Sequence, residues 1–141
     1  MIQLEERTMP LNTQISVYLK HRVGSLNELC TDLSDAGINI KALSTVDDID
    51  WAVVELIVDD IERAKVVLGK LELRYAESLV LTIELENKPG ALAEVIKPLS
   101  ENNINIVHTF LTGVGRRSLL VLHTTDNKKA DAIIRHSVAE H

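Results

Sequence analysis

A chain of 141 residues, of which 45% are hydrophobic and 26% charged, has the composition of a globular protein and fits one ordinary domain or two small ones. The net charge of −6 and the few scattered aromatic residues argue against a nucleic-acid partner, which requires a basic face. No apolar stretch approaches the roughly 20 residues of a membrane span, and the N-terminus is charged where a signal peptide is apolar. A single cysteine excludes an internal disulfide. We therefore expect a cytoplasmic protein without a membrane partner.

An alternating strand is the first predicted element. Apolar residues recur at every second position over 15–19, which predicts a strand with one buried face and one wetter face. A helix follows, for which Ser25 is the expected N-cap and Glu28 the residue that completes a capping box. Gly37 is expected to end this helix in the left-handed conformation, and Asn103 is expected to do the same for a later helix.

Two more strands and a second helix complete the first half of the chain. Residues 51–58 form a nearly continuous apolar run, which is typical of a central strand, and 38–45 precede them as a neighbouring strand. The next helix is expected to begin at Asp59 or Asp60. Residues 71–77 are then expected to form the last strand of this half.

The second half of the chain repeats the first half at one constant offset. Gly24 aligns with Gly90, and Ile38-Asn39-Ile40 aligns with Ile104-Asn105-Ile106, with no gap between these positions. An ungapped match through strand, helix and loop indicates a duplication. The repeat therefore predicts two further strands, over 104–111 and 117–124.

Each copy has the order strand, helix, strand, strand, helix, and the first copy adds a last strand. This order predicts an α+β fold of two ferredoxin-like βαββαβ domains in tandem, each an antiparallel sheet with helices on one face. The predicted domains are 12–77 and 78–141. The second domain lacks a last strand, so we expect Ile2 to Glu6, within the remaining segment 1–11, to be added to it as an edge strand. Because a single copy of about 65 residues has a marginal core, we also expect a homodimer.

The loop from Asn87 to Leu92 leads from a strand directly into a helix, and Asn105 on the next strand is expected to lie beside it. Unpaired backbone N–H groups at a helix N-terminus favour a carboxylate, and Gly90 allows a ligand to approach the backbone closely. An asparagine amide accepts from an ammonium group and donates to a carboxylate without adding charge. The loop therefore predicts a binding site for an α-amino acid.

Asn-Lys-Pro-Gly-Ala-Leu at 87–92, followed by Asn-Ile-Asn-Ile at 103–106, resembles the signature of ACT domains. These are regulatory modules of aspartate kinases, phosphoglycerate dehydrogenases and acetolactate synthase small subunits. They commonly pair, and their amino-acid sites lie at the interface and use the strand-to-helix loop and the next strand. The resemblance covers nearly the whole chain twice and implies the following ligand-binding residues: Asn87, Pro89, Gly90, Ala91, Leu92, Asn105 and Ile106 in the second copy, and His21, Gly24, Ser25, Leu26 and Asn39 in the first.

The two copies depart from this family pattern in different ways. Asn87 and Asn105 match the two asparagines that bind the effector in serine-sensing dehydrogenases, but Leu85 stands where those proteins have a histidine. This departure argues against serine as the effector. In the first copy, Val23 stands in the place of Pro89, so the second copy is expected to be the better site.

The resemblance implies a free-standing, non-catalytic regulatory protein without a cofactor. It would bind an amino acid or a similar small effector at domain interfaces and act on a metabolic partner enzyme or on its own assembly. Two alternatives remain open. The chain could be a small subunit or interaction module with empty ligand sites, its glycines and asparagines serving only the turns of the fold, or a small enzyme on the same scaffold.

Two loops at matching places in the copies carry opposite charge. The acidic loop 47–50 lacks the glycine turn and distal glutamate of a calcium loop, and the basic loop 113–117 joins two strands where a phosphate loop would open a helix. Both are therefore interpreted as hairpin turns, and their opposite charges suggest that they meet across an interface.

The histidines and the cysteine do not form a recognisable reactive set. His21, His108 and His123 lack a nucleophile and an acidic partner at catalytic spacing. Cys30 lies on the apolar face of a predicted helix, which favours a core position. The sequence therefore predicts neither a catalytic site nor a metal site.

Overall fold

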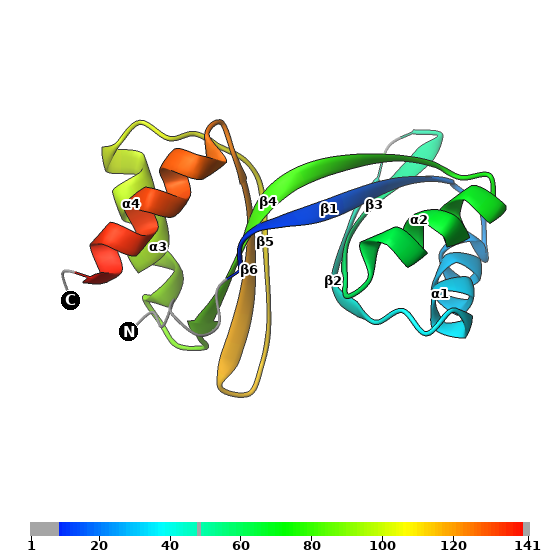
Figure 1. The fold of residues 1–141 in the computed structure, drawn as a ribbon, viewed down its shortest axis with the longest axis horizontal. Coiled ribbons are helices and arrows are strands. Elements are labelled where there is room, and N and C mark those ends of the chain that lie inside the picture. The colour runs from blue at the N-terminus through cyan, green and yellow to red at the C-terminus, as the bar shows by residue number, and fades with distance from the viewer. Residues whose placement is uncertain (1–8, 48, 140–141) are drawn as a thin grey trace. The chain divides into compact units, whose positions relative to one another are not determined.

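The computed structural model describes residues 9–47 and 49–139, which divide into two compact units. The N-terminal unit is Thr13–Ser78, and the C-terminal unit joins the described residues of Met1–Asn12 to those of Leu79–His141 (Figure 1). The elements, in chain order, are β1 (Met9–Lys20), α1 (Ser25–Asp35), β2 (Ile40–Asp47), β3 (Trp51–Val58), α2 (Ile61–Lys70), β4 (Arg74–Glu86), α3 (Ala91–Glu101), β5 (Ile106–Val114), β6 (Arg117–Thr124) and α4 (Asn127–Ala139).

The N-terminal unit is a sheet covered on one face by α1 and α2. Its strand order is β2-β3-β1-β4, where β1 contributes its residues from Thr13 onward and β4 its residues up to Ser78. β3 is antiparallel to both of its neighbours, and Val17 on β1 lies opposite Val54 on β3. Apolar side chains of β1 and β3 alternate inward and pack on Leu33 and other helix residues, as the period of two predicted.

The C-terminal unit repeats this architecture with α3 and α4. β4, β6 and β5 are neighbours in that order and pair antiparallel. The start of β1 belongs to this unit, where Leu11 packs on the core and the Asn12 side-chain amide donates a hydrogen bond of 3.2 Å to the Thr82 hydroxyl. The unit therefore takes strand residues from the beginning of the chain. The predicted edge strand, Ile2 to Glu6, lies outside the described residues.

These elements confirm the predicted α+β class with two βαββαβ patterns in tandem. One difference concerns the boundary between the copies, where the sequence predicted a strand over 71–77 and a separate strand after it. The structure has one strand there, β4, from Arg74 to Glu86. Its sequence contains no Gly, Pro, Asn or Asp to form a turn, so the chain stays extended from one unit into the next.

The helix ends follow the predictions with one correction. Ser25 is not the N-cap of α1; Gly24 is, with φ of +93°, and it makes no side-chain cap hydrogen bond. The expected capping box is therefore wrong, and the Glu28 carboxylate instead forms an ion pair with Arg22 at 2.9 Å. Asp60 caps α2 by accepting from the Arg63 N–H, as predicted. Gly37 and Asn103 both have the expected left-handed backbone.

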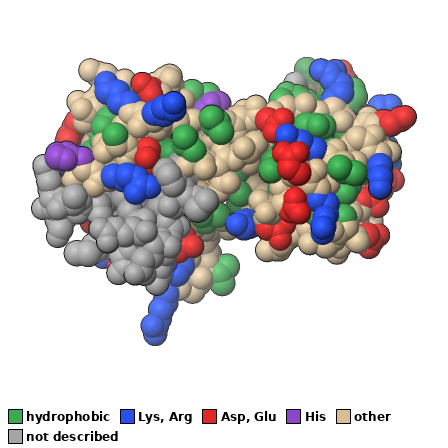
Figure 2. All heavy atoms as spheres, viewed as in Figure 1, with side chains coloured by type: hydrophobic (Ala, Val, Ile, Leu, Met, Phe, Trp, Pro, Cys, Tyr) green, Lys and Arg blue, Asp and Glu red, His purple; other side chains and the backbone are tan. Residues whose placement is uncertain are grey.

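The surface of the described residues carries charges of both signs. On the face drawn in Figure 2, Lys and Arg side chains stand among Asp and Glu side chains. Such mixing, together with the acidic net charge, disfavours a nucleic acid as a partner, because its phosphate backbone requires a basic face. No helix in the described part of the chain is long and apolar enough to cross a membrane.

Candidate functional site

The N-terminus of α1 presents backbone donors to solvent. The Ser25 N–H bonds to the Arg22 carbonyl at 3.4 Å, and the Glu28 N–H bonds to the Gly24 carbonyl at 2.9 Å. Between them, the N–H groups of Leu26 and Asn27 have no hydrogen-bond partner among residues 9–47 and 49–139. Two free amides at the positive end of a helix dipole form a site that favours an anion such as a carboxylate.

A hollow of about 260 Å³ lies beside this helix start and contains three of the predicted ligand residues, His21, Ser25 and Leu26. Its lining also includes Asp47 at the end of β2, whose Oδ1 lies 2.6 Å from Nε2 of His21. Both side chains are more than half exposed, so a ligand can reach them. Leu26 and Ala52 give the hollow apolar surface next to these polar groups.

Asp47 was missed by the sequence reading, which placed it in a solvated hairpin. The signal was present in the strand order. Leu19 on β1 pairs with Ala52 on β3, and Ala52 pairs with Asp47 on β2, so the ends of β1 and β2 lie at the same end of the sheet. This register brings Asp47 to the loop that contains His21.

Asn39 lies far from this hollow, at the opposite end of β2. Its backbone N–H donates to the Asp59 carboxylate at 3.0 Å, and its carbonyl accepts from the Asp59 N–H at 3.1 Å. β2 separates Asn39 from Asp47 by roughly 25 Å of strand. The N-terminal unit therefore groups four of its predicted residues, His21 to Leu26, around one helix start and leaves Asn39 apart.

The same backbone geometry recurs at the start of α3. Gly90 is the N-cap with φ of +90°, and its carbonyl accepts from the Glu94 N–H at 3.1 Å. The amides of Leu92 and Ala93 are without a partner in the described part of the chain. Pro89 and Leu92 are exposed, whereas Ala91 is buried against the core.

Asn87 is held by the turn between β5 and β6. Its backbone N–H donates to the Arg116 carbonyl at 2.9 Å, and its side-chain amide donates to the Gly115 carbonyl at 2.8 Å. Close by, Nζ of Lys88 lies 3.1 Å from the Glu86 carboxylate, and this hydrogen-bonded ammonium holds the pKa of Glu86 below its usual range. The polar groups of this junction are thus largely paired with each other.

Asn105 does not lie beside that loop, so the expected contact between the two asparagines is wrong for a single unit. Asn105 exchanges hydrogen bonds with Thr125, beyond the far end of β6, whereas Asn87 adjoins the residues before β6 begins. The reason is that α3 carries the chain back along the sheet before β5 starts. Asn105 and Ile106 instead line a shallow hollow of about 370 Å³ near the C-terminal end of α3.

The described ranges hold no group of three or more His, Cys, Asp and Glu residues placed to bind a metal ion. Cys30 is a free thiol and half-buried, and the ring of His108 lies 5.6 Å from that of Phe110.

The sequence model of a family described as "ACT domain pair" matches residues 10–140. Among solved structures, protein BT0572 from Bacteroides thetaiotaomicron is similar, with 25% identity and a TM-score of 0.85 over 92% of this chain and 89% of that one. The ligand-free regulatory subunit of aspartate kinase from Thermus thermophilus has a TM-score of 0.68 at 14% identity, over 99% and 96% of the two chains. The corresponding subunit from Thermus flavus has a TM-score of 0.58 at 12% identity, over 91% and 95%. No curated protein matches the sequence. The two aspartate kinase subunits share the fold with this chain.

Proposed function

The chain belongs to the ACT domain pair family, and from that premise we propose that it is a non-catalytic regulatory protein that binds an amino acid at the start of α1. One observation carries this proposal. The hollow of about 260 Å³ brings Leu26, whose helix amide is free, together with His21, Asp47 and apolar side chains. Those groups match the carboxylate, the ammonium and the side chain of an α-amino acid.

Each group has a defined role in this proposal. The N–H group of Leu26 binds the ligand carboxylate, and the ligand ammonium binds Oδ2 of Asp47, whose Oδ1 is held in place by His21. Leu26 and Ala52 contact the ligand side chain. The predicted residues of the second copy, including Asn87 and Asn105, remain candidate ligand residues, but the pairing of Asn87 with the turn supports a structural role for that loop.

A catalytic role is not proposed. Ser25 lines the same hollow as His21, which raises the question of a hydrolase-like arrangement with Asp47. Nucleophilic catalysis needs a hydrogen bond from the serine to its base, and none joins Ser25 to His21 among the described residues. Ser25 is also 9% exposed, which leaves its hydroxyl little access to a substrate.

Similar solved structures support an enzyme partner. Two of them are regulatory subunits of aspartate kinase, and a third contains aspartokinase alpha and beta subunits. We propose that this chain likewise regulates a separate enzyme and that it pairs with a second copy of itself. The alternative of an interaction module with empty sites is favoured by the paired polar groups around Asn87.

A thermal-shift screen against the common amino acids tests the proposal. A ligand at about 100 times its dissociation constant stabilises the native state by roughly 2.7 kcal/mol, which raises the melting temperature by about 5–10 °C for a chain of this size. We expect one or a few amino acids to give this rise and His21→Ala or Asp47→Ala to abolish it. A flat result over the whole panel would reject the sensor and favour the empty interaction module.

A further inference from the structure

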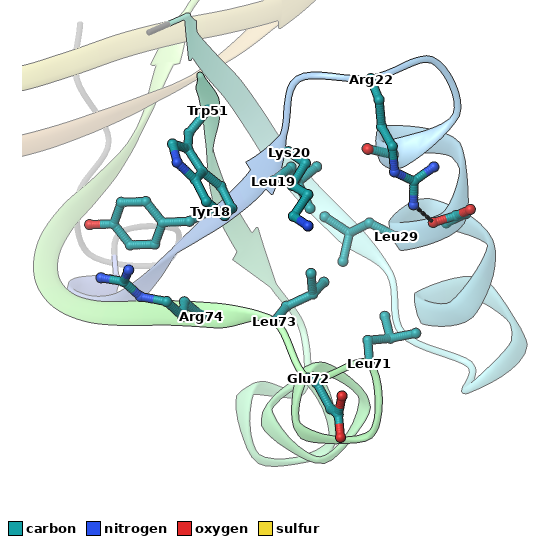
Figure 3. A pocket seen from close by; sticks show the side chains of 12 residues that line it. Tyr18, Leu19, Lys20, Arg22, Leu29, Trp51, Leu71, Glu72, Leu73 and Arg74 are labelled. Atoms are coloured by element: carbon teal, nitrogen blue, oxygen red, sulfur yellow. Dashed lines mark hydrogen bonds and ion pairs between the residues drawn. The ribbon is translucent and has the colours of Figure 1, made fainter. Parts of the chain in front are cut away.

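A second and larger hollow, of about 400 Å³, lies in the N-terminal unit where β1 ends and β4 begins (Figure 3). Its volume falls in the range of small-molecule pockets. The loop between α2 and β4 forms one wall, and the start of α1 forms another. It contains neither His21 nor Asp47 and is a different space from the hollow proposed above for the amino acid.

The floor of this hollow is apolar. Leu19 and Leu29 are core residues with 3% and 1% exposure, and Leu71 and Leu73 pack against the same core from the α2–β4 loop. An apolar ligand group placed here would leave water and gain about 25 cal/mol for each square ångström of surface buried. The floor therefore favours a ligand with an apolar body.

Two aromatic side chains stand on one side of the hollow. Trp51 lies opposite Lys20 in the β1–β3 pairing, and Tyr18 is two residues before Lys20, so all three project from the same face of the sheet. The Arg74 guanidinium lies 5.6 Å from the centre of the Tyr18 ring. Figure 3 shows the Tyr18 and Trp51 rings near one another, with Arg74 beside Tyr18.

The aromatic end of the hollow has unneutralised positive charge. The Arg22 guanidinium is already paired with the Glu28 carboxylate at 2.9 Å. Lys20, by contrast, has no ion pair within residues 9–47 and 49–139, and it lines the hollow together with Leu29 and Leu73. The positive end of an apolar hollow favours a carboxylate.

Glu72, which also lines the hollow, has an unfavourable backbone. Its φ is +55°, a value that favours glycine, and it follows the last turn of α2, where a negative charge opposes the helix dipole. The N–H groups of Glu72 and Leu73 close this helix end on the carbonyls of Gly69 and Leu68, each at 3.1 Å. These two hydrogen bonds form a Schellman motif, in which a helix ends at a residue with left-handed backbone.

The C-terminal unit lacks these features at the matching positions. At the offset that aligns Gly24 with Gly90, Glu84, Glu86 and Arg117 stand where the N-terminal unit has Tyr18, Lys20 and Trp51. Arg117 lies 3.4 Å from Glu84, and Glu86 pairs with Lys88. The aromatic and cationic set is thus particular to the N-terminal unit.

We propose that this hollow binds an apolar carboxylate, with the apolar body on the partly buried Leu71 and Leu73 and on the aromatic side chains, and the carboxylate on Lys20 and Arg74. This goes beyond the amino-acid site at the start of α1 and does not depend on it. The two hollows share Leu19, Lys20, Arg22 and Ser25 in their linings, but Arg74 lines only this one and His21 only the other. Substitutions at Arg74 and His21 therefore separate the two sites.

Trp51 is the only tryptophan of the chain, so its fluorescence reports on this hollow directly. The test is a fluorescence titration with 3-phenylpropionate, with the neutral 3-phenylpropanamide and with acetate as controls. We expect a saturable change with 3-phenylpropionate, about tenfold weaker binding of the amide because it lacks the charge, and no response to acetate.

Variants test whether the proposed residues cause the fluorescence change with 3-phenylpropionate. Arg74→Ala and Lys20→Ala should each weaken 3-phenylpropionate binding about tenfold, whereas Arg74→Lys should keep most of it. Arg116→Ala, which removes an exposed cation from the C-terminal unit, and His21→Ala should leave it unchanged. Equal binding of acid and amide would overturn the proposal, as would the absence of 3-phenylpropionate binding in both fluorescence and equilibrium dialysis. A Trp51 signal that changes only with protein concentration would also overturn it and would assign the hollow to a second copy of the chain.

Discussion

The two strand-to-helix junctions of this protein share a backbone but not their side chains. Gly24 and Gly90 both cap a helix with φ near +90°, and each is followed by two amides that have no partner among the described residues. Around the first junction His21 faces Asp47, whereas around the second Asn87 is bonded to the neighbouring turn. The duplication thus preserved the backbone of a helix start with two free amides, whereas the side chains around it differ between the copies.

The largest expected effect tests whether the two units have separate cores. Leu33 and Leu99 occupy matching positions, and both are fully buried in the clusters of their own units. Replacing either by alanine should lower the free energy of unfolding by about 2–5 kcal/mol, because each change leaves a cavity. Hydrogen exchange should show that Leu33→Ala lowers protection mainly in the N-terminal unit and Leu99→Ala mainly in the C-terminal unit. Equal loss of protection in both units for either variant would show that they unfold together.

A smaller effect tests whether the two junction backbones are equivalent. A Cβ at Gly24 or Gly90 meets no atom within 4 Å, so the cost of Gly24→Ala and of Gly90→Ala comes from the left-handed backbone alone. Each variant should lose about 1–2 kcal/mol of stability in chemical denaturation. Amino-acid binding should be weakened by Gly24→Ala only. If Gly90→Ala weakens binding more than Gly24→Ala does, the comparison between the junctions is reversed.

The smallest expected effect compares two helix ends. Glu72 and Asn103 both have positive φ, but asparagine tolerates this conformation better than glutamate does. Glu72→Gly should raise the melting temperature and add about 0.5–1 kcal/mol of stability, with a smaller gain for Asn103→Gly. A loss of stability in Glu72→Gly would contradict this prediction and would mean that the Glu72 side chain makes a favourable interaction.

The sequence predicted the fold well because the fold rests on local patterns. The repeat that aligns Gly24 with Gly90, the alternating strands and the positions of Gly37 and Asn103 are all visible without any tertiary contact. The capping box at Ser25 was wrong because glycine can itself cap a helix, and a local motif does not distinguish the two possibilities. The continuous β4 was missed because the repeat implied a boundary that no turn residue marks.

The candidate site was harder to predict because it depends on register and strand order. The motif correctly placed Gly24, Ser25 and Leu26 at a helix start. It could not show that Asn105 lies at the far end of β6 from Asn87, nor that Asp47 reaches His21 from another strand. Likewise, Arg74 meets Tyr18 only because β4 lies next to β1, although two helices and two strands separate them along the chain.

The central claim is that the start of α1, and not the start of α3, holds the effector. The most direct test is calorimetric titration of the amino acid with the largest thermal shift into the wild type and two matched variants, His21→Ala and Asn87→Ala, which change the same position of the two copies. We predict that His21→Ala loses at least tenfold in affinity, about 1.4 kcal/mol, while Asn87→Ala binds as the wild type does. Normal binding by His21→Ala together with loss of binding by Asn87→Ala would contradict the account and move the site to the second copy.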